Sequence, residues 1–402
     1  MVKIQPFRGW AFDTAKAGDI TKLVTPPHDV ISEKERKAFK KLSKHNIVRI
    51  ILPEGDDYSS AARALDELLS KGMIRQDSKL AYYAYEQEFK QRGKGMRRLG
   101  FLALVRAEPL GKDVLPHEQT FPDKVKDRLL LLQESRVETS PVFGLYKGNT
   151  KITKALARGR EHPLFEFKDA SGVVNRVWPV YDTREITDFF KGKKVIIADG
   201  HHRYTAASKF AESAKSEEEK FTMMYLVDIS DPALKILPTH RLIEDPRFDI
   251  MGFIERTSEF FDVIKVKDID ELQSRLEKHG KHSFGVHTKD DSYLLKLKDA
   301  QHADRLIKEG SSDWKRLDVS VLHALVLDRL LGVPKERIYY AKHQDDIIRM
   351  INDKTHHVAF LLPHTDISEV VKIVENSELM PHKSTYFSPK PLAGLVIRFI
   401  DR

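Results

Sequence analysis

The sequence contains no cysteine, which excludes disulfide bridges, cysteine-ligated zinc and thiol catalysis. No apolar run is long enough to cross a bilayer, and the first residues lack the pattern of a secretory leader. Internal repeats and low-complexity tracts are also absent. From these absences we expect a globular cytoplasmic protein with no membrane partner.

The sequence also lacks a strong excess of one charge. Its 68 Lys and Arg residues stand against 60 Asp and Glu residues, for a net charge of +8. The surplus is spread along the chain, with no concentrated basic stripe and no helix-turn-helix pattern, so a nucleic-acid partner is not expected. A modest positive balance suits an enzyme with anionic, phosphorylated substrates. The 402 residues suffice for two or three domains.

The most informative stretch is the apolar run at residues 195–198 with the polar cluster after it. Its β-branched residues predict a buried strand, and helical spacing of apolar residues begins shortly afterwards. The predicted strand-to-helix turn contains Asp199, Gly200, His201, His202 and Arg203. A helix start attracts phosphate, Gly200 permits close backbone approach, and Arg203 can hold an anion with two donors. The alternative is that Asp199 merely caps the helix while the histidines are solvated.

A second candidate is the loop at residues 116–120, followed by a predicted helix at 123–134. Several basic residues in that helix would surround Glu118, and a carboxylate in a cationic pocket can accept a proton from an alcohol. His117 beside it is a candidate for the substrate pocket. Residue 121 is Phe121, so the pattern is not that of a zinc protease. The alternative is a surface glutamate balanced by lysines.

The remaining candidates are shorter. Lys383, Ser384 and Thr385 form a loop suited to phosphate oxygens, although an ordinary polar turn has the same composition. Thr239, His240 and Arg241 are a candidate part of the substrate pocket and a second cationic contact; the alternative is a packed histidine beside a solvated arginine. Residues 26–29 form either the lip of a pocket or a rigid turn, and two prolines favour the turn.

Periodicity indicates an α+β protein in which helices and short strands intermix. The expected divisions are an N-terminal α/β region at 1–80, a core at 81–245, a small α+β domain at 246–335, and a C-terminal segment at 336–402 that returns to the phosphate site. Within the first region, the β-branched run at residues 46–52 predicts a strand.

Six motifs occur in order along the chain: PFRGW, TPPHDVIS, VLPHEQT, IADGHHRY, LKILPTHR and MPHKSTYFSPK. Together they resemble the DUF1015 family of bacterial and archaeal proteins across nearly the whole chain. Where that family usually has tyrosine in the first proline motif, this chain has His28.

Three of these motifs also resemble those of archaeal free-serine kinases, which have the ParB/sulfiredoxin-like fold. The resemblance implies such a fold for the core, with a mixed sheet, and implies that Glu118 is the catalytic base. It further implies nucleotide and metal binding at residues 199–203 and phosphate binding at residues 383–385. Mg²⁺ would then reach Asp199 through ATP or ADP. The serine kinases carry a tryptophan near their substrate where this chain has residues 238–240, without one.

The sequence hypothesis is therefore a phosphotransferase acting from ATP or ADP on a small hydroxylated metabolite. Free L-serine, giving O-phosphoserine, is the favoured acceptor by resemblance. Such transfer needs positioning and charge neutralisation more than covalent help from the protein. Two alternatives remain open: a ParB-like nucleotide-binding switch, and a nucleotide hydrolase whose acceptor is water. The oligomeric state is not predicted.

Overall fold

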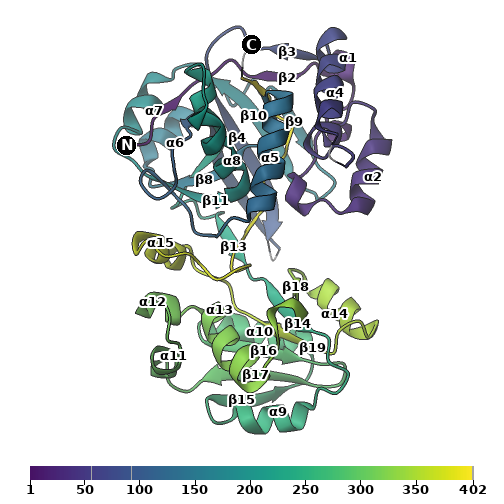
Figure 1. Ribbon diagram of the computed structural model, residues 1–402, viewed down its shortest axis with the longest axis vertical. Coiled ribbons are helices and arrows are strands. Elements are labelled where there is room, and N and C mark those ends of the chain that lie inside the picture. The colour runs from purple at the N-terminus through teal and green to yellow at the C-terminus, as the bar shows by residue number, and fades with distance from the viewer. Residues whose placement is uncertain (56, 92, 401–402) are drawn as a thin grey trace. The chain divides into compact units, whose positions relative to one another are not determined.

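The computed structural model describes residues 1–55, 57–91 and 93–400, which form two compact units (Figure 1). Unit 1 comprises Met1–Leu234 and Pro389–Arg402, and unit 2 comprises Lys235–Ser388. Unit 2 is thus inserted into unit 1. The expected divisions near residues 245 and 335 differ from these boundaries, because strands on both sides of 246–335 pair within the sheet of unit 2.

Unit 1 is built on a nine-stranded sheet in the order β6-β11-β8-β12-β5-β4-β10-β9, with β1 also paired to β5. The pairs β6–β11 and β8–β12 are parallel, and the other pairs are antiparallel. The α+β class with a mixed sheet is therefore confirmed. The strands of this sheet are β1 (Ile4–Gln5), β4 (Tyr82–Gln91), β5 (Lys94–Arg106), β6 (Val114–Leu115), β8 (Val142–Tyr146), β9 (Phe165–Lys168), β10 (Val174–Val180), β11 (Val195–Asp199) and β12 (Phe221–Asp228).

Two smaller strand pairs complete the β structure of unit 1. They are β2 (Trp10–Phe12) with β3 (Ile74–Gln76), and β7 (Val137–Glu138) with β21 (Arg398–Phe399). The second pair joins residues 398–399 to the body of unit 1.

Most α-helices of unit 1 bury apolar side chains, but the first two have no buried residue. The α-helices of this unit are α1 (Thr14–Ala17), α2 (Glu33–Leu42), α3 (Val48–Ile51), α4 (Tyr58–Ser70), α5 (Pro122–Ser135), α6 (Thr150–Ala157), α7 (Arg184–Phe189) and α8 (His201–Glu212). Helices α5 and α8 pack together through Leu132, Ala207 and Phe210. That contact holds the start of α8, which bears most of the predicted site, in a fixed place.

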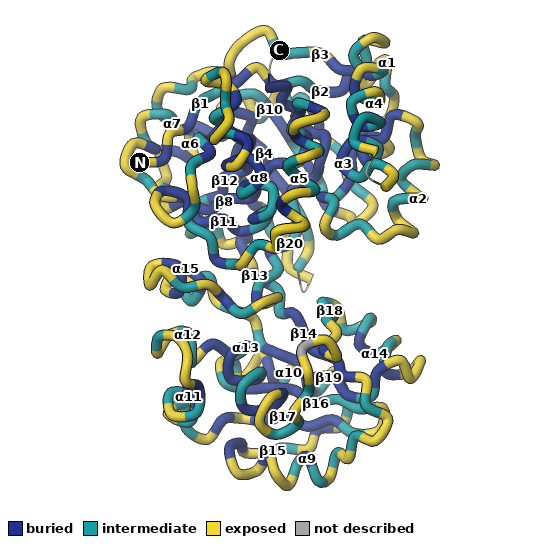
Figure 2. Tube along the Cα trace, viewed as in Figure 1, coloured by how far each residue is buried: buried dark blue, intermediate teal, exposed yellow. Residues whose placement is uncertain are grey.

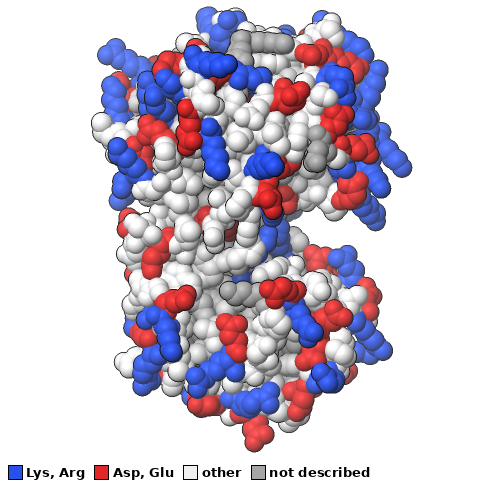
Figure 3. Space-filling model, in the orientation of Figure 1, with Lys and Arg blue, Asp and Glu red and all other residues white. Residues whose placement is uncertain are grey.

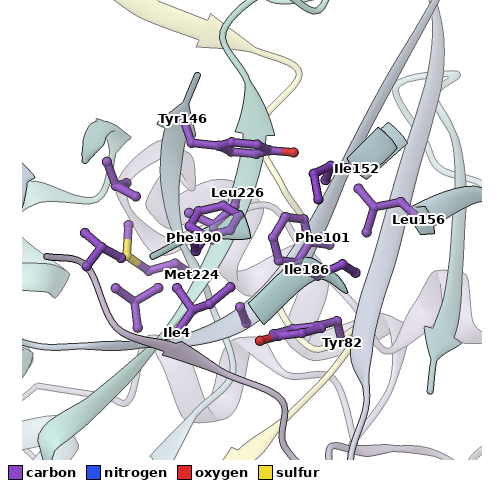
Figure 4. Packing of buried hydrophobic residues seen from close by; sticks show 14 of the residues in the cluster. Ile4, Tyr82, Phe101, Tyr146, Ile152, Leu156, Ile186, Phe190, Met224 and Leu226 are labelled. Carbon is purple, nitrogen blue, oxygen red and sulfur yellow. The ribbon is translucent and has the colours of Figure 1, made fainter. Parts of the chain in front are cut away.

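The main core of unit 1 lies between the sheet and helices α6 and α7. Phe101 and Met224 from the sheet pack there with Ile152, Ile186 and Phe190 from the helical segments (Figure 4). The strands β8, β11 and β12 are accordingly almost wholly buried, and so are residues 82–87 of β4 (Figure 2). Burial of this much apolar surface is the main stabilising contribution to such a fold.

Unit 2 has its own six-stranded antiparallel sheet in the order β15-β17-β16-β19-β14-β18. Its strands are β14 (His240–Ile243), β15 (Phe261–Val266), β16 (Ser283–His287), β17 (Ser292–Leu297), β18 (Ile338–Ala341) and β19 (Val358–Leu361). Its helices are α9 (Ile250–Thr257), α10 (Ile269–His279), α11 (Gln301–Leu306), α12 (Ser312–Lys315), α13 (Asp318–Val321), a π-helical segment at Leu322–Leu330, α14 (Gln344–Asn352) and α15 (Ile367–Glu375). A separate core of aliphatic side chains lies on this sheet.

The unit begins and ends in one strand pair. Strand β13 (Lys235–Leu237) is antiparallel to β20 (Tyr386–Ser388), with Lys235 opposite Ser388. The chain therefore enters and leaves unit 2 at neighbouring positions.

One predicted element is wrong. Residues 46–52, expected to be a strand, contain helix α3 instead. The side chain of Asn46 accepts a hydrogen bond from the backbone N–H of Val48 at 2.9 Å and donates one to the carbonyl of Lys22 at 2.7 Å. These contacts start the helical turn, and burial on several sides removes the periodicity that would have indicated a helix.

Among the described residues, no helix combines the length and apolar content that crossing a membrane requires. On the face drawn in Figure 3, basic and acidic side chains are interspersed over both units.

Candidate functional site

The predicted strand-to-helix turn is present at the junction of β11 and α8. A register shift lies between Ile197 and Asp199, and such a bulge redirects the side chain that follows it. Gly200 is the N-cap of α8, with φ of 89° in the left-handed region that favours glycine. Asp199 is therefore not the helix cap, because its carboxylate binds two cations instead.

Asp199 is the centre of a chain of alternating charges. Its Oδ2 lies 2.9 Å from the Arg203 guanidinium, and its Oδ1 lies 2.5 Å from Lys390 Nζ. The same ammonium also forms an ion pair with Asp29. Residues 29, 199 and 390 are far apart in the sequence, so only the tertiary fold of unit 1 assembles this cluster.

Burial and charge act in opposite directions on these groups. Burial raises the pKa of Asp199 above its usual value, since Lys390 and Arg203 offset it only in part. Burial also opposes ionisation of Asp29, but the charges of Lys390 and Arg203 hold the pKa of that carboxyl well below its usual range. Burial disfavours the charged form of Lys390, yet Asp199 and Asp29 keep its pKa above the ordinary value.

Arg203 folds back over the start of its own helix. A Cβ atom added to Gly200 would lie 2.9 Å from a terminal nitrogen of this guanidinium. Arg203 also donates to Ser140 Oγ at 2.9 Å and to the carbonyl of Pro141, while its buried Nε has no hydrogen-bond partner. A cavity of about 70 Å³ lies beside it, with His28 and Arg128 among its polar walls.

The two histidines of the turn hold the loop that carries Glu118. The backbone N–H of His117 donates to His201 Nε2 at 3.2 Å, and the backbone N–H of Phe121 donates to His202 Nε2 at 3.1 Å. The ring of Phe121 stacks on His202 with an interplanar angle of 18°. Both imidazoles thus act as acceptors from the loop.

These acceptor roles require neutral imidazoles at the accepting nitrogens. Burial, reinforced by the neighbouring histidines, pulls the pKa of His201 well below its ordinary value. Burial also lowers the pKa of His117, whose Nδ1–H donates to the carbonyl of Ile197 at 2.6 Å. The loop is therefore attached both to the strand β11 and to the start of α8.

Glu118 lies on the open side of this arrangement. Its side chain is 31% exposed, and Oε1 is 3.9 Å from Nε2 of the fully buried His117. The structure thus brings the Glu118 loop and the Asp199–Arg203 turn together in unit 1. A half-open carboxylate next to a helix start can accept a proton from a hydroxyl group bound beside the helix.

The other predicted residues lie in unit 2. Arg241 is buried there, and one of its terminal nitrogens donates to the carbonyls of His382 and Lys383 at 3.4 and 3.2 Å. Arg241 is therefore not a solvated arginine, and burial lowers its pKa to about 10. His240 is packed: Nδ1 accepts the N–H of Leu362 at 3.2 Å, and burial followed by the charge of Arg241 lowers its pKa to about 3.

The Lys-Ser-Thr loop borders this second cluster. Thr239 is buried, and its carbonyl accepts a hydrogen bond from Arg241. Ser384 is buried and donates to the carbonyl of Pro381, whereas Lys383 is exposed and has a positive φ of 58°. Thr385 follows it, half-buried. The predicted residues thus form two clusters, one in each unit, and phosphate binding by Lys383, Ser384 and Thr385 stays a prediction.

Sequence reasoning missed two members of the first cluster, Asp29 and Lys390. Both lie inside motifs that were recognised: Asp29 in the proline motif, and Lys390 as the last residue of the C-terminal motif. The rigid turn that two prolines favour for Asp29 is present, because Asp29 lies within a short 3₁₀ turn at His28–Val30. For Lys390, the only local indication of a functional role is that a charged residue ends the motif.

The donor set does not fit a magnesium ion held by Asp199. Each of its two oxygens already contacts a cation, Lys390 or Arg203. Among the described residues, no three His, Asp or Glu side chains surround a common point. We therefore derive no step from a metal bound to this carboxylate.

The fold and the site define a two-unit α+β protein with a charge-balanced cluster at a strand-to-helix turn. The chain belongs to the DUF1015 family, described as a protein of unknown function, whose sequence profile matches residues 4–320. No curated protein matches the chain.

Solved structures give distant likenesses. A conserved hypothetical protein from Pyrococcus furiosus is 15% identical, covering 72% of this chain and 93% of its own, with a TM-score of 0.36. A free serine kinase in complex with AMP is 14% identical, covering 68% and 83%, with a TM-score of 0.34. SbnI with a C-terminal truncation, from Staphylococcus aureus, is 11% identical, covering 73% and 85%, with a TM-score of 0.37.

Proposed function

We propose that the protein is a phosphotransferase that moves a phosphoryl group from ATP or ADP to a small hydroxylated metabolite, with free L-serine as the favoured acceptor. The observation that carries the proposal is the docking of the Glu118 loop onto the start of α8 by His201 and His202. This places a partly exposed carboxylate next to the part of the fold best suited to a phosphate.

In this proposal, the start of α8 binds the phosphate groups of the nucleotide. Backbone N–H groups and the helix dipole attract anions there, and the N-cap residue Gly200 adds no side chain of its own. The guanidinium of Arg203 lies over the same position. Phosphoryl transfer depends mainly on such positioning and charge neutralisation, and little on covalent participation by the protein.

In this proposal, Glu118 activates the hydroxyl group of the acceptor. Its carboxylate accepts the proton of the attacking hydroxyl group, and the alkoxide oxygen forms a bond to phosphorus as the bond to the departing nucleotide breaks. His117, beside Glu118, and Thr239, His240 and Arg241 in unit 2 remain predicted contacts to the acceptor. The ParB/sulfiredoxin-like fold of the core and the presence of Mg²⁺ with the nucleotide also remain predictions by resemblance.

The test compares wild-type protein with Glu118→Gln. Each protein is incubated with radiolabelled ATP or ADP and a panel of amino acids, and ADP binding is measured by calorimetry. We expect phosphoserine from the wild type, a loss of about 10²- to 10⁴-fold in turnover for Glu118→Gln, and unchanged ADP binding. Glu134→Gln, at an exposed position of α5, is the matched control and should retain activity.

The other outcomes separate the alternatives. Free phosphate without a phosphorylated acceptor would identify a hydrolase, and ADP binding without turnover would identify a nucleotide-binding switch. Full activity in Glu118→Gln would remove the proposed base, and absence of nucleotide binding in the wild type would overturn the whole proposal.

A further inference from the structure

Lys390 lies between two carboxylates, those of Asp29 and Asp199, that are far apart in the sequence. Its Nζ contacts Asp199 Oδ1 at 2.5 Å and also contacts Asp29, and its side chain is only 7% exposed. Both carboxylates are therefore within reach of one point, and the ammonium group occupies that point.

The backbone around Lys390 is fixed by a buried polar network on the central sheet. Arg98, fully buried on β5, donates to the carbonyl of Pro389 and to the side chain of Gln87. Gln87 on β4 donates to the carbonyl of Lys390 at 3.3 Å. The Arg98 guanidinium lies 5.0 Å from the ring centre of Phe143, a favourable cation–π position. These contacts fix the backbone position from which the Lys390 side chain reaches Asp29 and Asp199.

Two carboxylates around one position are also the arrangement by which proteins hold Mg²⁺ next to a phosphate. Here the alternation of Asp29, Lys390, Asp199 and Arg203 gives two negative and two positive charges, so the cluster is balanced by the protein itself. Removing the lysine would leave two adjacent carboxylates and only one cation. Such a pair gains most from a bound divalent ion.

We propose that Lys390 is the resident cation of this site and occupies the position that a divalent metal would otherwise take between Asp29 and Asp199. It keeps both carboxylates in place, and through Asp199 it keeps Arg203 over the start of α8. Lys390 is thus a positioning residue. The inference rests on the proposed function only where nucleotide binding is concerned, because the exchange of lysine for metal concerns this chain alone.

The first experiment measures Mn²⁺ binding by electron paramagnetic resonance, with wild-type protein, Asp199→Asn, Lys390→Met and the double variant Lys390→Met with Asp199→Asn. We expect no site at this pair in the wild type and one new Mn²⁺ site in Lys390→Met, with an affinity at least about tenfold above the wild type. The double variant should lose that site. Lys191→Met, which removes an exposed lysine paired with Asp188 at 2.7 Å, should resemble the wild type.

Two results would overturn the inference. One is a Mn²⁺ site in the wild type that Asp199→Asn removes, which shows that a metal already lies at this pair. The other is a folded Lys390→Met, as judged by circular dichroism, that gains no Mn²⁺ site. The wild-type measurement decides the question even if Lys390→Met fails to fold.

A second measurement distinguishes this inference from the proposed function. Wild-type protein is titrated with ADP in EDTA and in Mg²⁺. We expect the two affinities to agree within about threefold, and a loss above about tenfold in EDTA that Asp199→Asn abolishes would contradict a resident lysine cation. If ADP does not bind under either condition, the proposed function fails, while the Mn²⁺ results still decide the role of Lys390.

Discussion

At the scale of single residues, the histidines of the turn make contacts that the sequence does not indicate. The rings of His201 and His202 each accept a backbone N–H from the Glu118 loop, and their binding of nucleotide phosphates stays a prediction. A neutral imidazole can be an acceptor, and burial keeps His201 neutral. These side chains position the candidate base, which is a role that a motif alone does not distinguish from ligand binding.

Replacement of His201 should therefore lower the free energy of unfolding, because the Glu118 loop loses a hydrogen bond. In His201→Ala the N–H of His117 stays buried without its acceptor, which costs about 1–3 kcal/mol in the free energy of unfolding. In His201→Gln the side-chain carbonyl can accept the same N–H, so the loss should be smaller. Urea denaturation of the two variants measures the difference, and equal stability of His201→Ala and the wild type would contradict the assigned contact.

The same histidine predicts how stability depends on pH. Its pKa is well below the ordinary value in the folded chain, whereas the unfolded chain titrates near about 6.5. Below that pH the unfolded chain binds a proton that the folded chain does not, so the unfolding free energy falls as the pH falls from 7 to 5. The slope should be shallower in His201→Gln, because that variant lacks this titrating group.

At the scale of elements, the β11–α8 turn depends on a residue without a side chain. Gly200 has a left-handed φ, and the guanidinium of Arg203 lies over it. A methyl group here would push that guanidinium away from Asp199 and Ser140, so the cost would include their hydrogen bonds. A substitution at Gly200 should therefore disrupt both the β11–α8 turn and the charge cluster.

Gly200→Ala tests this coupling against Gly55→Ala. Gly55 also has a positive φ, 57°, but an added Cβ there meets no atom within 4 Å. Gly55→Ala should cost about 1–2 kcal/mol for the backbone alone. Gly200→Ala should cost more and should also weaken ADP binding, as thermal unfolding and calorimetry would measure. Equal losses with normal ADP binding in both variants would contradict the coupling.

Some elements could be predicted from local sequence patterns, and others could not. The turn at 199–200 was predictable because an apolar run, a glycine and helical spacing occur in sequence. Helix α2 likewise begins after a local signal, because Ser32 and Glu35 form a capping box at its start. The strand expected at 46–52 was wrong because side-chain contacts of Asn46 determine the local conformation.

The candidate site was also predictable from the sequence only in part. The Glu118 loop and the Asp199 turn were both identified from their motifs, and the structure places them together. The ion pair between Asp29 and Lys390 joins residues 361 positions apart, and nothing local to either residue indicates the other. Long-range pairs of this kind follow from the sheet order and from the return of the chain after unit 2, which sequence periodicity does not encode.

At the scale of the whole molecule, the chain returns to unit 1 after unit 2 and contributes side chains there. The segment after unit 2 supplies Lys390 to the charge cluster, and Arg398 forms an ion pair with Glu138 at 2.6 Å. Unit 2, in contrast, is entered and left through one strand pair, with Lys235 opposite Ser388. A short connection can therefore replace residues 235–388 without stretching the chain of unit 1.

Such an excision tests where the nucleotide site lies. With residues 235–388 replaced by a short Gly/Ser linker, unit 1 keeps its own sheet, its core and all four charges of the cluster. We expect it to fold, as circular dichroism would show, and to bind ADP with at most about a tenfold loss, because the only predicted phosphate contacts that it removes are those of Lys383, Ser384 and Thr385.

The full-length variant Lys383→Met is the matched control for this loss. If the loop holds phosphate, the point variant should lose about as much ADP affinity as the excision, because both remove the same ammonium group. If Lys383→Met binds normally while the excision is weakened, other residues of unit 2 contribute instead. A folded unit 1 with no ADP binding at all would show that the cluster of Asp29, Lys390, Asp199 and Arg203 is insufficient to hold the nucleotide, which contradicts its assignment as the phosphate side of the site.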